Sequence, residues 1–317
     1  MLQLVLIGIS AGAASALMFS SVASGSLFAV ILFYLAPLPI LLAAIGWMHV
    51  AGLIAAVVGA AALASIFGSY FFFAFLLGIG LPAWGLGYLT LLAKPKERQL
   101  EWFPPGQLVL WSALFGALVV VAAITNFGFD AESMQSGMRS AFERVIRANT
   151  GHAADAAIKL PGGGNPDRLL DVLVAAVPPI AAMIATLSNV FNLWLAARIV
   201  QISGRLRRPW PDLSEIRFPN WAMFALLGSF IGIFLPGLLG IILGVVAASL
   251  MMAFVMLGFS VLNGMTRHMN GRAFLLGGIY AAVIILGWPA LFMILLALAD
   301  SFFDFRSRAD ARKRPQI

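Results

Sequence analysis

The sequence predicts an all-α fold, a polytopic integral membrane helical bundle. The first 93 residues contain no Lys, Arg, Asp or Glu, whereas a domain that folds in water needs charged side chains on its outer face. Over the whole chain, 62% of the residues are hydrophobic and 10% are charged, which is far from the composition of an ordinary globular domain. The basic residues, which outnumber the acidic ones by 20 to 13, cluster in short segments between apolar runs. This distribution is typical of cytoplasmic loops.

The composition also excludes several classes of function. The chain has no cysteine, so disulfides, thiolate nucleophiles and iron–sulfur clusters are excluded. Its three histidines, His49, His152 and His268, are far apart in sequence, so we expect no metal site and no cofactor. The basic residues do not form one water-exposed face, and we therefore expect the partner to be the lipid bilayer and no nucleic acid.

In the first part of the chain, each apolar run has about the length of one membrane crossing, roughly 20 residues. These runs predict helices at residues 2–19, 26–45, 50–66, 70–93 and 107–125. Pro37, Pro39 and Pro82 fall inside two of them and predict kinks. The charged segment at 94–98 is expected to be a loop.

Residues 128–171 are polar and mixed in charge, unlike the runs on either side. Asp130 is a suitable N-cap for a helix that places Met134, Met138, Phe142 and Val145 on one face. We predict an extracytoplasmic loop with an amphipathic helix on the membrane surface, followed by a flexible glycine-rich connection at 162–166. A small packed extramembrane subdomain is the alternative.

The later apolar runs predict helices at 172–200, with a kink at Pro178 and Pro179, and at 221–234 and 238–262. The last run, 273–303, is long for one crossing and is interrupted at Gly287-Trp288-Pro289. Two short helices there would return the basic tail to the cytoplasm, in agreement with the positive-inside rule. The chain is thus expected to be a single transmembrane domain with both termini cytoplasmic and about ten hydrophobic segments, of which about eight to ten are true spans.

Two amides mark a candidate binding site in the 172–200 helix. Asn189 and Asn192 lie three residues apart, on one side of the helix, and Trp194 follows them. An amide in lipid is costly unless it is paired, and such groups often line a substrate path. The three residues are therefore candidate substrate contacts, and the alternative is that the two amides join helices by hydrogen bonds.

A second group of polar residues lies where the last helix leaves the membrane. Asp300, Asp304 and Arg308 recur at four-residue spacing, and Arg306 lies between the last two. This order suits ion pairing along a helix. We expect an interfacial ion-pair collar, with a coupling or binding role as the alternative.

Small residues recur at helical spacing in several apolar runs. Gly8-Ile9-Ser10-Ala11-Gly12 matches the G-x-S-x-G pattern, but a nucleophile elbow needs a strand–turn–helix context that an apolar helix does not supply. We therefore interpret these glycines as a face for close helix packing and expect no enzyme and no catalytic residue. Gly228/Gly232 and Gly240/Gly244 form similar faces. They suit intrachain contacts or, alternatively, a membrane-protein partner.

Two segments carry a family resemblance. The closing segment 297–306, Ala-Leu-Ala-Asp-Ser-Phe-Phe-Asp-Phe-Arg, and the early segment 33–39, Phe-Tyr-Leu-Ala-Pro-Leu-Pro, resemble the uncharacterised YybS-like bacterial membrane protein family, a domain of unknown function. That family is distantly similar to the substrate-binding S components of energy-coupling-factor vitamin transporters. The resemblance implies the bacterial cytoplasmic (inner) membrane and capture of a small solute for a partner module. No vitamin-specific motif can be matched, so the ligand stays unknown and no substrate residue is carried over.

Two functions remain open from the sequence. The first is a small-solute-binding, S-component-like transport protein, favoured by the kinked helices, the asparagine pair and the resemblance. The second is a non-transporting membrane scaffold or cell-envelope assembly factor, favoured by the lack of charge inside the apolar runs. Ion-coupled transporters usually carry carboxylates within the membrane, and this sequence places none in the middle of a run.

Overall fold

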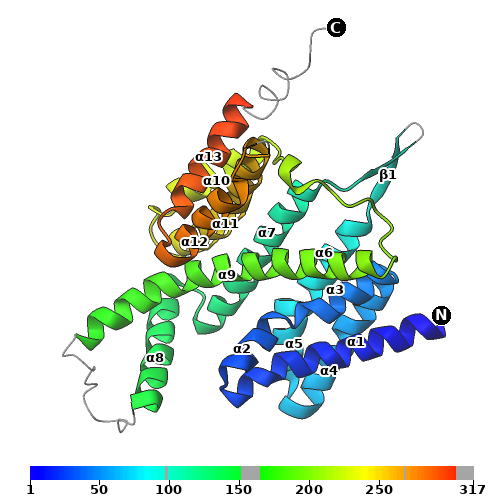
Figure 1. Ribbon diagram of the computed structural model, residues 1–317. Helices are drawn as coiled ribbons and strands as arrows, with labels where there is room; N and C mark the ends of the chain where they lie inside the picture. The colour runs from blue at the N-terminus through cyan, green and yellow to red at the C-terminus, as the bar shows by residue number, and fades with distance from the viewer. Residues whose placement is uncertain (97–98, 151–164, 268, 305–317) are drawn as a thin grey trace. The chain divides into compact units, whose positions relative to one another are not determined.

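The structure is a computed structural model that describes residues 1–96, 99–150, 165–267 and 269–304. The described residues are almost entirely helical (Figure 1), and the all-α prediction is confirmed. The first α-helices are α1 (Leu2–Ser20), α2 (Leu27–Tyr34), α3 (Pro37–Gly46), α4 (His49–Phe67), α5 (Ser69–Phe75) and α6 (Leu81–Leu91). The later ones are α7 (Pro105–Ile124), α8 (Ala131–Thr150), α9 (Pro166–Ile202), α10 (Trp221–Gly232), α11 (Leu238–Met265), α12 (Arg272–Leu286) and α13 (Ala290–Phe303).

The apolar segments among these helices agree with the sequence prediction. Seven are long and apolar enough to cross a membrane, judged by length and composition: Leu2–Ser24, Leu27–Gly46, His49–Phe67, Ser69–Leu91, Pro105–Phe127, Pro166–Ile202 and Leu238–Met265. The helices α10, α12 and α13 are apolar but shorter. Within the described residues, these are the ten predicted hydrophobic segments. How many of them cross the membrane stays a prediction.

The predicted interruptions occur at proline and glycine. The second span is divided between α2 and α3, where Pro37 begins the new helix. The fourth contains a π-helical turn, η2 (Leu76–Gly80), just before Pro82. Gly287 separates α12 from α13 with a φ of +74°, which a side chain would strain. The last apolar run is therefore two helices, as predicted.

Two local predictions were wrong. The segment expected to be a loop contains two strands, because β1 (Ala93–Lys96) pairs antiparallel with β2 (Gln99–Trp102), Ala93 opposite Trp102. Helix α9 begins at Pro166 rather than at residue 172. The reason is the cap, since the Asn165 side-chain oxygen accepts from the Asp167 amide at 2.9 Å, and proline suits the first turn of a helix.

The residue contacts divide the chain into two compact units. Unit 1 comprises Met1–Ser112, Leu187–Ala222 and Met252–Ile317, and unit 2 comprises Ala113–Thr186 and Met223–Met251.

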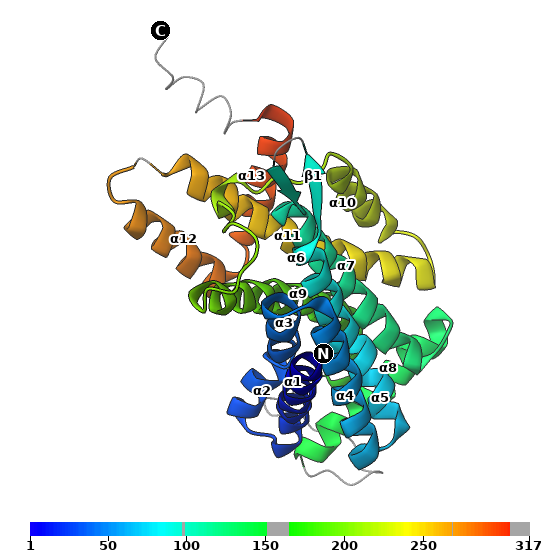
Figure 2. The same cartoon turned by 90° about the vertical axis from the view of Figure 1, so that its right-hand side faces the viewer.

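In unit 1, α1 packs along α4 (Figures 1 and 2). The contact depends on small residues, because a Cβ added at Gly12 would lie 2.6 Å from the Ala55 carbonyl oxygen. Ser10 donates to the Leu6 carbonyl of its own helix at 2.9 Å. The glycines of the G-x-S-x-G match therefore serve helix packing.

In unit 2, one face of α8 packs against the neighbouring helices. Met134 and Met138 are buried in a cluster with residues of α7, α9 and α11, and Phe142 packs at its edge. Val145, predicted on the same face, is 57% exposed. The apolar face of α8 was expected to turn toward lipid or the bundle, and its two methionines pack against helices of the bundle. The location of α8 at the membrane surface stays a prediction. The glycine-rich connection expected after α8 falls outside the described residues as far as residue 164.

Candidate functional site

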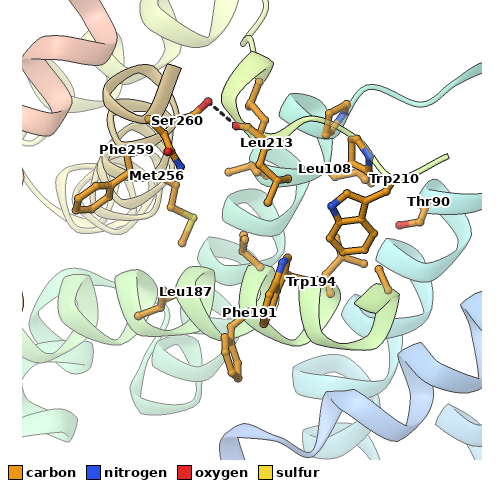
Figure 3. A pocket seen from close by; sticks show the side chains of 18 of the residues that line it. Thr90, Leu108, Leu187, Phe191, Trp194, Trp210, Leu213, Met256, Phe259 and Ser260 are labelled. Atoms are coloured by element: carbon orange, nitrogen blue, oxygen red, sulfur yellow. Dashed lines mark hydrogen bonds between the residues drawn. The ribbon is translucent and has the colours of Figure 1, made fainter. Parts of the chain in front are cut away.

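Unit 1 contains a cavity of about 630 Å³ (Figure 3). Its wall is contributed by α6, α7, α9, α11, α12 and the segment between α9 and α10. Most lining residues are apolar, and five are aromatic: Phe191, Trp194, Trp210, Phe259 and Tyr280. Figure 3 shows the Trp194 side chain rising from α9 toward the segment that carries Trp210. A cavity of this size and lining suits a small, largely apolar molecule.

The segment 203–220, here called the basic loop, is tied to the helices of unit 1. Ser260 of α11 donates to the Leu213 carbonyl oxygen at 2.7 Å (Figure 3). Arg217 pairs with Asp304, at 3.1 Å, just after α13. The basic loop, predicted from its charge only as a cytoplasmic connection, thus forms one wall of the cavity.

Asp212 provides a further attachment of this loop. Its carboxylate accepts from the Ser214 hydroxyl at 2.7 Å and from the Ser214 amide at 2.9 Å, and it pairs with Arg267 after α11. These donors lower the pKa of Asp212 from its ordinary value of 3.8 to about 2, with the Ser214 hydroxyl contributing most. Asp212 is therefore ionised at neutral pH.

Among the described lining residues of the cavity, Arg208 is the charged one. It is only 8% exposed, and one terminal nitrogen, Nη2, donates to the Phe103 carbonyl oxygen at 3.3 Å. Its Nε is buried and has no hydrogen-bond partner among the described residues. Burial lowers the pKa of the guanidinium. Among the described lining residues there is no Asp or Glu.

The candidate residues of α9 occupy different places. Trp194 lines the cavity, whereas Asn189 and Asn192 are not among its lining residues. Asn192 is fully buried and donates to the Tyr34 carbonyl oxygen at 2.8 Å. Asn189 donates to the Ser112 carbonyl oxygen at 3.2 Å. Both amides therefore bond to the backbone of other helices, and a substrate role for them stays a prediction.

The described part of the predicted collar is arranged around the end of α13. Asp300 is 5% exposed, in the last helical turn. Asp304 follows the helix in a left-handed conformation and pairs with Arg217 of the basic loop. Arg306 and Arg308 lie outside the described residues. The sequence spacing did not reveal the Asp304 partner, which is distant along the chain.

Sequence reasoning missed Arg208 and Trp210 as cavity residues. The arginines of the basic loop indicate a cytoplasmic segment, but charge alone does not distinguish a buried arginine from an exposed one. The available signal was Pro209-Trp210-Pro211. A tryptophan held between two prolines in a charged segment indicates a loop of restricted shape with an apolar contact to make.

The apolar helices define a multi-pass membrane protein. The chain belongs to the family described as "Predicted membrane protein (DUF2232)", whose model matches residues 13–301. No curated protein and no solved structure matches the chain. The resemblance to the YybS-like family rests on segments 33–39 and 297–306, and the similarity to S components of vitamin transporters is inferred only through that family.

Proposed function

We propose that the protein binds a small solute in the unit 1 cavity, as the substrate-binding component of a membrane transport system does. The observation that carries the proposal is the cavity of about 630 Å³ with its aromatic wall. Ligand sites are typically concave, mostly apolar and about 300–1,000 Å³ in volume. The S-component resemblance of the sequence supports the same function.

The polar groups of the wall are few, and most have partners. Thr90 donates to the Leu86 carbonyl oxygen at 2.8 Å, and Ser260 donates to Leu213. The Asn263 oxygen accepts from Arg272. A solute would therefore be held mainly by apolar and aromatic contact, with its orientation set by a small number of polar groups.

The described part of the cavity wall contains no carboxylate. Proton- and ion-coupled carriers usually place Asp or Glu beside the substrate path, and the lining residues include neither. We propose that the energy for transport comes from a partner module, as the S-component resemblance implies.

Native mass spectrometry of the gently solubilised full chain tests the proposal. We expect a co-purified small molecule on the wild type and a much smaller bound fraction for Trp194→Ala. Trp221→Ala is the matched control, because Trp221 of α10 is 59% exposed and is not a lining residue. Equal retention of the molecule by all three proteins would place it elsewhere. A co-purified protein with no small molecule would favour the scaffold function.

A further inference from the structure

Arg208 is a buried cation whose side chain is incompletely hydrogen-bonded. A guanidinium has five N–H donors and cannot accept. The structure gives Arg208 one hydrogen bond, from Nη2 to Phe103, and leaves the buried Nε without a partner in the described chain. A buried ionised donor without an acceptor is costly, more so than a neutral one. The missing acceptor therefore has to be explained.

We infer that the cavity binds an amphipathic anion, whose carboxylate or phosphate group is bound by Arg208 and whose apolar body lies against the aromatic wall. The inference rests on the proposed function and names the class of its ligand. The Nε–H and a neighbouring terminal N–H of arginine lie side by side on one edge of the guanidinium. They match the two oxygens of a carboxylate or phosphate.

The surroundings of Arg208 fit an anion. None of the lining residues that the structure describes is acidic, so none of them competes for the guanidinium. In the basic loop, the Asp212 carboxylate is already bonded to Ser214 and Arg267. Because the Ser260 and Thr90 hydroxyls donate to backbone carbonyls, Arg208 supplies the charge-assisted donor of the cavity.

The rest of the wall fits an apolar body. Phe191 and Trp194 of α9 are lining residues, and they are 47% and 42% exposed. Figure 3 shows Met256 and Phe259 of α11 on the other side of the same space. The basic loop lies at a predicted membrane boundary, so an anionic group at Arg208 would sit near the headgroup level with its apolar part among the helices.

The test measures binding to the full chain in nanodiscs of zwitterionic phosphatidylcholine, with empty nanodiscs subtracted. The probes are dodecyl phosphate, dodecanol and inorganic phosphate. For the wild type we expect dodecyl phosphate to bind about tenfold or more tightly than dodecanol, from the strength of a charge-assisted hydrogen bond. In Arg208→Met this preference should disappear while dodecanol binding is retained. Arg207→Met is the matched control, since Arg207 is an exposed neighbour outside the wall, and it should keep the preference.

The outcomes separate the two proposals. Dodecanol and dodecyl phosphate binding equally to the wild type would overturn the anion inference and leave the proposed function standing. Binding of neither would overturn the proposed function itself. Inorganic phosphate binding as tightly as dodecyl phosphate would overturn the requirement for an apolar body. If Arg208→Met does not fold, the preference of the wild type for dodecyl phosphate over dodecanol still decides. Arg208→Lys keeps the positive charge but lacks the paired N–H donors of a guanidinium, so it should show a smaller preference for dodecyl phosphate.

Discussion

The side-chain amide of Asn192 donates to the backbone carbonyl of Tyr34, 158 positions earlier in the sequence, at 2.8 Å. This carbonyl is available because Pro37 has no N–H and the Leu38 amide donates to Leu35 instead. Ser188, one turn before Asn192, donates to the same oxygen at 3.1 Å. The proline that divides α2 from α3 thus creates the acceptor that attaches α9, as expected where a membrane helix is broken.

Replacing Asn192 by Leu should lower the free energy of unfolding by about 0.6 to 1.7 kcal/mol, the range measured for interhelical hydrogen bonds in membranes. Ser188 remains to satisfy Tyr34, so the protein should still fold. Asn189→Leu is the comparison and should cost less, because its bond is longer and its side chain is only partly buried. Thermal unfolding in detergent measures both. Neither substitution should alter the amount of bound ligand. Loss of the ligand from a variant that carries both substitutions would support a substrate role for the two asparagines.

Close packing of α1 on α4 predicts a strong effect at Gly12. Alanine there would bring Cβ within 2.6 Å of the Ala55 carbonyl oxygen and 3.0 Å of the Gly59 nitrogen. Since both are backbone atoms, the helices would have to separate, at about 1–3 kcal/mol. In α12, by contrast, a Cβ at Gly277 would meet nothing within 4 Å. Gly277→Ala should be neutral or slightly stabilising in the same unfolding assay, and equal losses at the two positions would contradict the packing argument.

Helix α8 offers a test of its buried face. Met134 is fully buried in unit 2 and Val145 is 57% exposed. We expect Met134→Ala to cost about 2–5 kcal/mol, as for other large-to-small core substitutions, and Val145→Ala to cost little. Chemical denaturation in mixed micelles compares them. An insensitive Met134 would indicate that the face lies in lipid instead.

The helices, their breaks and the apolar side of α8 were predictable from the sequence, each for a different physical reason. The apolar runs and the Pro37 and Gly287 breaks follow from local chemistry, and the structure has them. The side of α8 that carries Met134 and Met138 also follows from helical period. The helical period does not show whether that side of α8 contacts lipid or protein, because both surroundings are apolar.

The candidate site was less predictable because its residues meet only in three dimensions. Burial cost indicates that Asn192 must be paired, but the Tyr34 carbonyl that pairs with it depends on a break in another helix. Arg208 lies in the same basic segment of the sequence as Arg205 and Arg207, which are exposed. Only the fold distinguishes Arg208, which bonds to the Phe103 carbonyl oxygen and lies in a cavity wall built from helices distant in the chain.

The predicted topology can be tested by cysteine labelling, because the chain has no native thiol. Both termini and the loops at 94–105, 201–220 and 265–272 should face the cytoplasm, and 128–171 should face outward. Ser136 of α8 and Lys96 of β1 are exposed, so Ser136→Cys and Lys96→Cys are suitable probes. An impermeant maleimide should label the first in intact cells and the second only after permeabilisation. The reverse pattern would invert the topology.

The last prediction follows from Asp212 and concerns the stability of the basic loop in acid. Its folded pKa is lowered to about 2, below the ordinary value of 3.8, by Ser214 and Arg267. A carboxyl group with a lowered folded pKa contributes stability that is fully present above its unfolded pKa and is lost as the pH falls through the folded one. The contribution of Asp212 should therefore decline between about pH 4 and pH 2. Because the side chain is 41% exposed, screening by solvent and salt will keep the effect modest.

The unfolding temperature of the wild type, followed across this pH range, should fall more steeply than that of Asp212→Asn, which cannot titrate. Arg267→Gln should show an intermediate slope, since it removes the ion pair but keeps the Ser214 bonds. If the unfolding temperatures of the wild type and Asp212→Asn fell equally with pH, the ionised Asp212 carboxylate would not contribute to the stability of the folded state.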